Sequence, residues 1–256
     1  MAVAIGRTPV RLDGLRLLVP DRELRVIGSP EFESTTRRRL LDALPVGGVF
    51  VDVGAHVGTM ALPAACRVGP AGHVHAVEPS PASAAVLAEN AALNGVDNIT
   101  VHGCAVGADA DTRPFHLMDL SYLNGLANEP LAEPIATISI DVHRLDELID
   151  APRVDAVKID VEGAELEVLA GMSGLVERNP GLVLCVEWNP VTMRACGHDP
   201  LLLIDALAAL GFHGSEVIDE SRGGRLRPIN EVWAAIAAGR VDDSWWGNLI
   251  VRREAA

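Results

Sequence analysis

Short apolar runs that alternate with helix-like segments constrain the fold more than any other feature of the chain. The runs cover residues 48–54, 73–78, 98–106, 154–160 and 181–188. Strands that alternate with helices of about 10–15 residues form βαβ units and a mostly parallel sheet. Because these runs are continuously apolar, we expect helices on both faces of the sheet. The sequence therefore predicts an α/β protein with a doubly wound sheet.

Two regions fall outside this alternation. Residues 1–44 precede the first core strand and are predicted to form short strands followed by a helix that ends at Leu44. Residues 107–137 contain polar turns and are predicted to form a lid-like insertion. The expected organisation is an N-terminal extension over residues 1–44 and a main domain over residues 45–256 that carries the insertion.

The charge balance disfavours nucleic acid and membrane partners. The chain has 35 Asp and Glu against 21 Lys and Arg, a formal net charge of −14. Such a chain repels nucleic-acid phosphates and anionic headgroups. No segment approaches the roughly 20 apolar residues of a membrane span, and the four cysteines lack metal-binding spacing. We expect a soluble, cytoplasmic protein that binds neither nucleic acid nor membrane.

A glycine turn after the first core strand predicts a cofactor site. The stretch VFVDVGAHVGTMAL, Val49–Leu62, places Gly54 and Gly58 between a strand and a helix. Glycines allow a tight turn and a close helix, and the N–H groups at the helix start attract a carboxylate or a phosphate. Glu78 ends the second core strand. A carboxylate at this place accepts hydrogen bonds from both hydroxyls of a ribose.

The composition of this turn favours S-adenosylmethionine over NAD. A dinucleotide needs a middle glycine so that its pyrophosphate lies against the backbone, and His56 stands in that place. S-adenosylmethionine has no pyrophosphate. Its amino and carboxylate groups suit Asp52 together with the backbone N–H groups at Ala55 and His56. Cys104 and Ala105, after the third core strand, are expected to line the adenine pocket.

Several segments resemble the FkbM-type S-adenosylmethionine-dependent methyltransferases. These segments are VFVDVGAHVGTMAL, HVHAVEPSP, LAENAALNGVDNITV, RLDELI and VDAVKIDVEGAELEVLAG, with a weaker likeness in GNLIVRR. The resemblance covers about residues 45–190, and KIDVEGAE is its most specific element. It implies a Rossmann-like class I methyltransferase fold with a mostly parallel, seven-stranded sheet whose last strand is antiparallel. The implied cofactor residues are Asp52, Gly54, Gly58 and Glu78.

The implied reaction is methyl transfer to a hydroxyl, often on a sugar or a polyketide-type natural product. Asp160 and Glu187 end the fourth and fifth core strands and are the candidate catalytic residues. An alcohol is a weak nucleophile, so a carboxylate that takes its proton or orients it promotes the reaction. Asp160 is equally suited to contact the cofactor or to cap the following helix. Two carboxylates also suit a divalent metal, but no third ligand is evident, so no metal is predicted.

The remaining residues of these segments receive structural or substrate roles. Lys158 is interpreted as a strand residue whose charge reaches solvent or a neighbouring carboxylate. Three acidic residues are assigned to the start of the following helix: Glu162, Glu165 and Glu167. Acceptor contacts are predicted for Tyr122, Asn124, Trp188 and Asn189, with Trp188 as a stacking surface. Trp245 and Trp246 are interpreted as packing or oligomer contacts, which leaves a homo-oligomer as an expectation.

Three functions stay open on the sequence alone. The preferred one is an S-adenosylmethionine-dependent O-methyltransferase of a small hydroxylated metabolite, with N- or C-methylation as variants. A non-catalytic partner protein that binds S-adenosylmethionine would show cofactor binding without turnover. An NAD(P)-dependent oxidoreductase would need a Tyr or Lys pair near the nicotinamide, and the single tyrosine, Tyr122, has no lysine close to it in the sequence.

Overall fold

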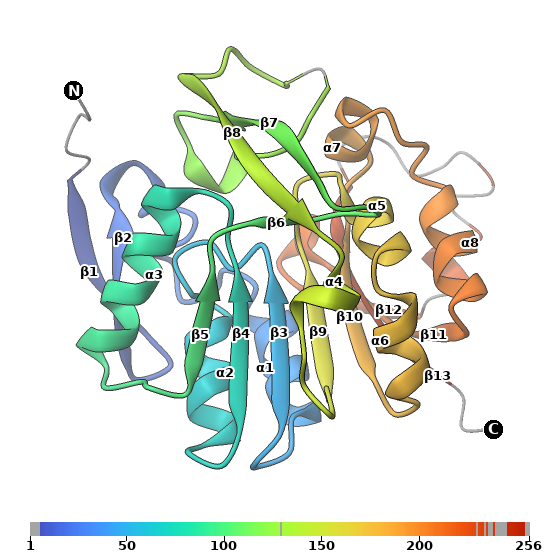
Figure 1. The fold of residues 1–256 in the computed structure, drawn as a ribbon, viewed down its shortest axis with the longest axis horizontal. Coiled ribbons are helices and arrows are strands. Elements are labelled where there is room, and N and C mark those ends of the chain that lie inside the picture. Colours follow the sequence, from blue (N-terminus) through green and yellow to red (C-terminus); the bar gives the residue numbers. More distant parts are fainter. Residues whose placement is uncertain are drawn as a thin grey trace.

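A mixed sheet of eight strands forms the centre of the computed structural model (Figure 1), which describes residues 6–128, 130–228, 230–232, 234, 238 and 245–253. The strands are β3 (Val49–Val53), β4 (His73–Val77), β5 (Ile99–His102), β9 (Ala156–Ile159), β10 (Val183–Trp188), β11 (Phe212–Asp219), β12 (Arg225–Pro228) and β13 (Gly247–Arg253). Their order in the sheet is β12-β11-β13-β10-β9-β3-β4-β5. The carboxyl ends of the central parallel strands therefore meet at one edge of the sheet.

The directions of the strands confirm the predicted α/β class. Strands β5, β4, β3, β9 and β10 pair in parallel, whereas β13 is antiparallel to both β10 and β11. The expected count of seven strands is wrong by one, because β12 adds an antiparallel edge strand beside β11. Its sequence RLRP is short and charged, as edge strands often are, so it lacks the apolar run that marks a core strand.

Helices cover both faces of the sheet, as predicted. One face packs against α1 (Ser34–Ala43), α2 (Ala61–Val68) and α3 (Pro81–Leu93), with Phe50 of β3 in this core. The other face packs against α4 (Leu145–Leu148), α5 (Glu165–Ala170), α6 (Ser173–Arg178) and α8 (Leu202–Ala209), with Val51 and Val53. Neighbouring residues of β3 thus enter opposite cores, which follows from the two-residue period of a strand.

The segment that follows β9 forms two short helices, α5 and α6, in place of one continuous helix. Gly171 lies between them, and a Cβ atom there would be only 2.0 Å from the backbone oxygen of Gly107. This close approach lets the segment after β6 (Ala105–Val106) pass directly over the break. The sequence shows the glycine but not the distant backbone that requires it.

A second sheet lies above the carboxyl ends of the core strands (Figure 1). Strands β6, β7 (Asp111–Leu117) and β8 (Ala136–His143) assemble in the order β6-β8-β7, and the insertion contributes its β7 and the start of its β8. A short 3₁₀ helix, Ser121–Leu123, follows β7. The amide and the hydroxyl of Ser121 both donate to Glu23 Oε1, over 2.6 and 2.7 Å. The N-terminal extension is therefore bound directly to the insertion.

The extension also packs against the main domain through its hairpin. Strands β1 (Arg7–Leu12) and β2 (Leu15–Pro20) pair in an antiparallel hairpin. Asn90 of α3 accepts from the Leu18 amide over 2.6 Å and donates to the Val57 carbonyl over 2.9 Å. One buried amide side chain thus joins the hairpin to the glycine turn that follows β3.

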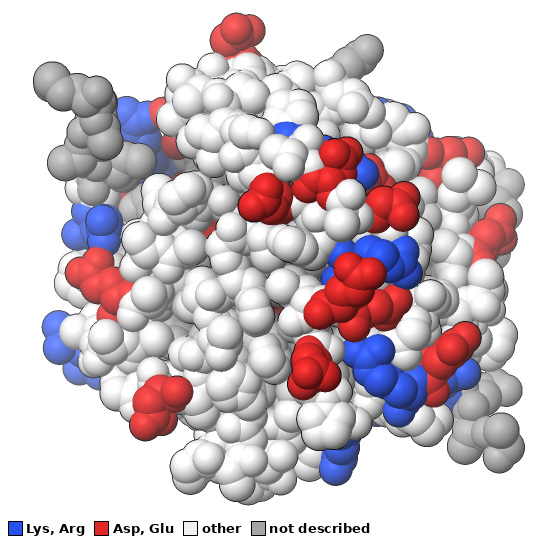
Figure 2. Space-filling view, in the orientation of Figure 1, with Lys and Arg blue, Asp and Glu red and all other residues white. Residues whose placement is uncertain are grey.

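Charged side chains of both signs alternate on the face drawn in Figure 2. They gather over α4 to α6, whereas the surface over β4 and β5 is largely uncharged. Lysine and arginine side chains form no continuous patch among the described residues on this face. In the part of the chain that the structure describes, no helix has the length and hydropathy needed to span a bilayer.

Candidate active site

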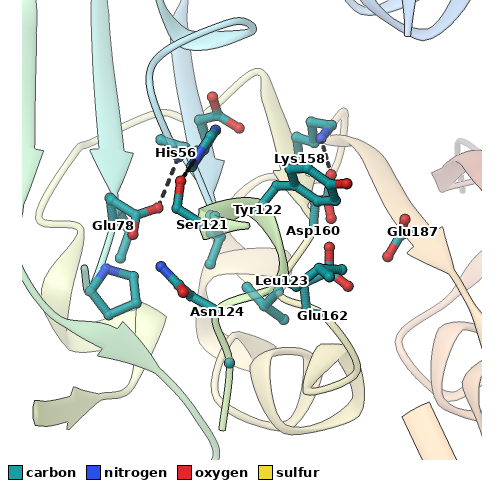
Figure 3. Close-up of a pocket in the computed structure, with 18 of the residues that line it drawn as sticks. His56, Glu78, Ser121, Tyr122, Leu123, Asn124, Lys158, Asp160, Glu162 and Glu187 are labelled. Atoms are coloured by element: carbon teal, nitrogen blue, oxygen red, sulfur yellow. Dashed lines mark hydrogen bonds and ion pairs between the residues drawn. The ribbon is translucent and has the colours of Figure 1, made fainter. Parts of the chain in front are cut away.

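A cavity of about 370 Å³ lies where the core strands end and the insertion covers them. The predicted site residues that line it are Asp52, Gly54, Ala55, His56, Glu78, Ala105, Tyr122, Asn124, Asp160, Glu187 and Asn189. Figure 3 shows His56 and Glu78 at one end and Asp160, Glu162 and Glu187 at the other. The cavity thus joins the expected cofactor turn to the expected catalytic carboxylates.

Three predicted site residues do not line the cavity, and Trp188 is the clearest correction. Its side chain is 3% exposed and lies in the sheet core, where its indole N–H donates to the Pro200 carbonyl over 2.9 Å. Its ring packs on Trp245, with 4.9 Å between centroids. Because Trp188 fills the core, it offers no surface for an acceptor, and Trp246 lines the cavity instead.

Gly58 and Cys104 are the other two residues outside the cavity lining. Gly58 adopts φ +93°, and a Cβ there would approach Leu62 to 3.0 Å, so its role is to close the turn against α2. Cys104 is buried in the core beside the sheet. Both residues therefore contribute to the structure around the cavity without facing it.

At Gly54 the backbone of the turn comes very close to the backbone of Asp160. It adopts φ +88°, and a Cβ atom would lie 1.7 Å from the backbone oxygen of Asp160. The amides of Gly54 and Ala55 both donate to the Val77 carbonyl at 3.0 Å. The turn after β3 is therefore fixed between the ends of β4 and β9, and only glycine fits there.

The carboxylate of Glu78 is held in place by two backbone amides. Its Oε1 accepts from Ser80 N and its Oε2 accepts from His56 N, both over 2.8 Å. His56 adopts φ +47°, which turns its amide toward Glu78. The side chain is buried, and burial raises its pKa to about 7. Each oxygen keeps further acceptor capacity for a ligand.

His56 links the cofactor turn to the insertion. Burial lowers the pKa of its imidazole to about 4, so the ring is neutral near pH 7. Ser121 donates its hydroxyl proton to Glu23, so it accepts from His56 Nε2, 2.7 Å away. Sequence reasoning missed Ser121 and Glu23, because neither lies in a motif and their partners are distant in the chain.

Lys158 is buried at the end of the cavity that contains the catalytic carboxylate candidates. Its Nζ donates to Asp160 Oδ2 over 2.5 Å and lies 3.4 Å from Glu33 Oε2. Its charge therefore reaches neighbouring carboxylates, one of the two interpretations that its position allowed. Glu33 also accepts from Asn248 over 3.1 Å and lines the cavity, although nothing in its local sequence marks it as a site residue.

Glu162 lies in the cavity lining, which corrects its assignment to the helix start. It has φ +55° and precedes α5 by three residues. Burial, together with the negative charge of Asp160, raises the pKa of its carboxyl well above the usual range. Glu165 instead stabilises the loop before α5. Its Oε1 lies within 3.2 Å of the amides of Val161 and Gly163 and accepts a hydrogen bond from both.

Asp52 provides a test of whether a cationic ligand fits. Its carboxylate is buried, and neither oxygen has a hydrogen bond of good geometry among the described residues, although the Ala61 amide is close enough to lower its pKa. Burial raises its pKa to about 7, and the charge of Lys158 opposes this rise. A buried acceptor without a donor is costly. The site therefore fits a ligand that brings an ammonium group to the turn, as S-adenosylmethionine does.

The sheet order, the antiparallel β13 and a cavity across the carboxyl ends of the strands define a class I methyltransferase fold. Residues 52–213 match the family model described as Methyltransferase FkbM domain, and the chain belongs to this family. The family resemblance is thereby confirmed. The cofactor is S-adenosylmethionine, which removes NAD from consideration.

Two relatives and one solved structure illustrate these similarities. Methyltransferase 1 of Beauveria bassiana is 25% identical over 151 residues, covering 50% of this chain and 59% of that protein. Hexuronic acid methyltransferase AglP of Haloferax volcanii is 28% identical over 162 residues, covering 57% and 58%. The chain thus spans less than two thirds of the length of either relative. The structure of M. jannaschii TYW2 in complex with AdoMet shares the fold, with a TM-score of 0.51, 15% identity, and coverage of 99% and 90%.

The raised pKa of Glu78 predicts that cofactor affinity depends on pH. With a pKa of about 7, most of this carboxyl is protonated at pH 6 and ionised at pH 8. Ribose hydroxyls donate more strongly to the ionised form. We expect calorimetry to show about tenfold tighter binding of S-adenosylhomocysteine at pH 8 than at pH 6. The Glu78→Gln variant should reduce this pH dependence and leave only the part that Asp52, whose pKa is also about 7, contributes through the ammonium group. A flat profile in the unaltered protein would contradict the assignment.

Proposed function

We propose that this chain is an S-adenosylmethionine-dependent O-methyltransferase that acts on a hydroxyl of a small metabolite, such as a sugar or a polyketide-type natural product. The observation that supports it most is the convergence of Asp160 and Glu187 in the cavity that also contains the cofactor turn. Lys158, the single lysine or arginine in the described cavity lining, is already paired with Asp160 and Glu33. An uncharged acceptor suits this lining better than an anionic one.

The residues of the site have distinct roles in this proposal. Glu78 and Asp52 hold the cofactor, which supplies an activated sulfonium methyl when bound. Asp160 and Glu187 orient the acceptor hydroxyl, and one of them takes its proton as the new C–O bond forms and the C–S bond breaks. Tyr122 and Asn124 of the insertion contact the acceptor and shield it from water, which is the lid role that we assign to the insertion.

The decisive experiment follows the methyl group itself. The protein is incubated with S-adenosylmethionine carrying a CD₃ group and, in separate arms, with neutral polyols and polyketide alcohols, uronic acids and primary amines. We expect mass spectrometry to find the label on a hydroxyl of a neutral compound, as an ether. A label found only on a carboxylate or an amine would overturn the O-directed proposal. Tight binding of S-adenosylhomocysteine without labelling in any arm would instead favour a non-catalytic binding protein.

A further inference from the structure

Three carboxylates from separate parts of the chain meet at the acceptor end of the cavity. Asp160 follows β9, Glu162 lies in the next loop and Glu187 is near the end of β10. One oxygen of each lies within 4.8 Å of the other two. Figure 3 shows the three side chains directed toward one another. Such an arrangement of oxygen atoms matches the ligands of Mg²⁺ and Mn²⁺.

Glu187 adds an observation of its own that points to a ligand. The residue is 5% exposed, and its Oε2 is buried without a hydrogen-bond partner among the described residues. The side chain lines the cavity and is aimed at Asp160 and Glu162. A buried carboxylate oxygen without a donor is costly, because it loses water and gains nothing in exchange. A bound cation would remove this cost.

Lys158 compensates only part of the negative charge of the three carboxylates. Lys158 contacts Asp160 through Oδ2, which leaves the second oxygen of that carboxylate for another ligand. Its other ion-pair partner is Glu33, outside the cluster. Glu162 and Glu187 have no ion pair with a described lysine or arginine. One ammonium group therefore faces five carboxylates of the cavity lining, those of Glu33, Asp52, Asp160, Glu162 and Glu187.

We propose that Asp160, Glu162 and Glu187 bind one divalent cation, Mg²⁺ or Mn²⁺, and that this cation holds the oxygen of the acceptor. Glu162 is the third ligand that was missing from the sequence, because its place in a loop before α5 resembles an ordinary helix start. Binding of the cation rests only on the geometry of these residues. Its role toward the acceptor rests on the proposed function.

The test measures Mn²⁺ binding to the full chain, with the free ion followed by electron paramagnetic resonance. We expect one Mn²⁺ per chain, displaced by Mg²⁺, with and without S-adenosylhomocysteine. The Glu162→Gln and Glu187→Gln variants should each weaken binding at least about tenfold, since each removes one charged ligand. Glu133→Gln removes an exposed carboxylate of the insertion and should leave Mn²⁺ binding unchanged. Binding of S-adenosylhomocysteine reports whether each variant is folded.

Each result decides the proposal. Absence of Mn²⁺ binding to the unaltered chain would overturn it, whatever the variants do. Binding that survives in both Glu162→Gln and Glu187→Gln would also overturn it, because the ion would then lie elsewhere. The labelling experiment distinguishes this failure from that of the proposed function: methyl transfer without Mn²⁺ binding refutes only the cation site. Mn²⁺ binding without transfer to any hydroxyl refutes only the function.

Discussion

Replacing Glu78 with Ala should weaken the binding of S-adenosylhomocysteine by about 100-fold or more. The variant loses two kinds of interaction together. It removes the carboxylate that we expect to accept from the ribose hydroxyls, and charge-assisted hydrogen bonds of this kind contribute about 1.5–3 kcal/mol. It also leaves the amides of His56 and Ser80 without their acceptor, so the turn after β3 is less well fixed.

Calorimetry on the purified chain measures this loss. Asp97→Ala is a suitable control, because Asp97 is an exposed carboxylate just before β5, at the opposite end of the strands from the cavity. Its affinity should match that of the unaltered chain. Equal affinity of Glu78→Ala and the control would show that Glu78 does not hold the cofactor.

The Gly54→Ala substitution should lower the free energy of unfolding by at least about 3 kcal/mol, a large effect for one methyl group. The new Cβ would meet the backbone oxygen of Asp160 at 1.7 Å, and backbone on both sides must move to relieve this contact. The positive φ adds a further cost of about 1 kcal/mol. Movement there also displaces Asp160, so cofactor binding should be lost as well.

Gly95→Ala separates the two contributions to this effect. Gly95 also has a positive φ, +65°, but a Cβ atom there meets no atom within 4 Å. This control should lose only about 1 kcal/mol. Urea unfolding followed by tryptophan fluorescence gives both values. If the two variants are equally stable, the turn after β3 is more adaptable than its contacts indicate.

The parts of this protein that could be predicted are those determined by local pattern. Continuous apolar runs identify β3, β4, β9 and β10, and parallel pairing then brings the residues at their ends to one edge. For this reason Asp52, Glu78, Asp160 and Glu187 meet in one cavity although they are far apart in the sequence. The antiparallel last strand came from the resemblance, since periodicity carries no information about strand direction.

The residues that escaped prediction depend on distant partners. Glu33 enters the site through contacts with Lys158 and Asn248, which are 125 and 215 positions away in the chain. Trp188 was misplaced for the opposite reason. A tryptophan after a strand-end carboxylate suggests an exposed ring, but the strand continues through it, so the ring turns into the core. Local composition does not show where a strand stops.

The contact of Glu23 and His56 with Ser121 bears on how such a protein acquires new acceptors. The insertion is joined at one residue, Ser121, both to Glu23 of the N-terminal extension and to His56 of the turn after β3. Exchange of the whole insertion for that of a related protein would therefore be destabilising unless residue 23 changed with it. An insertion without Ser121 would leave the buried Glu23 carboxylate without these two donors. Among related proteins that differ in their acceptor, we expect substitutions in the insertion to occur together with substitutions in the N-terminal extension. The turn after β3 should stay the same.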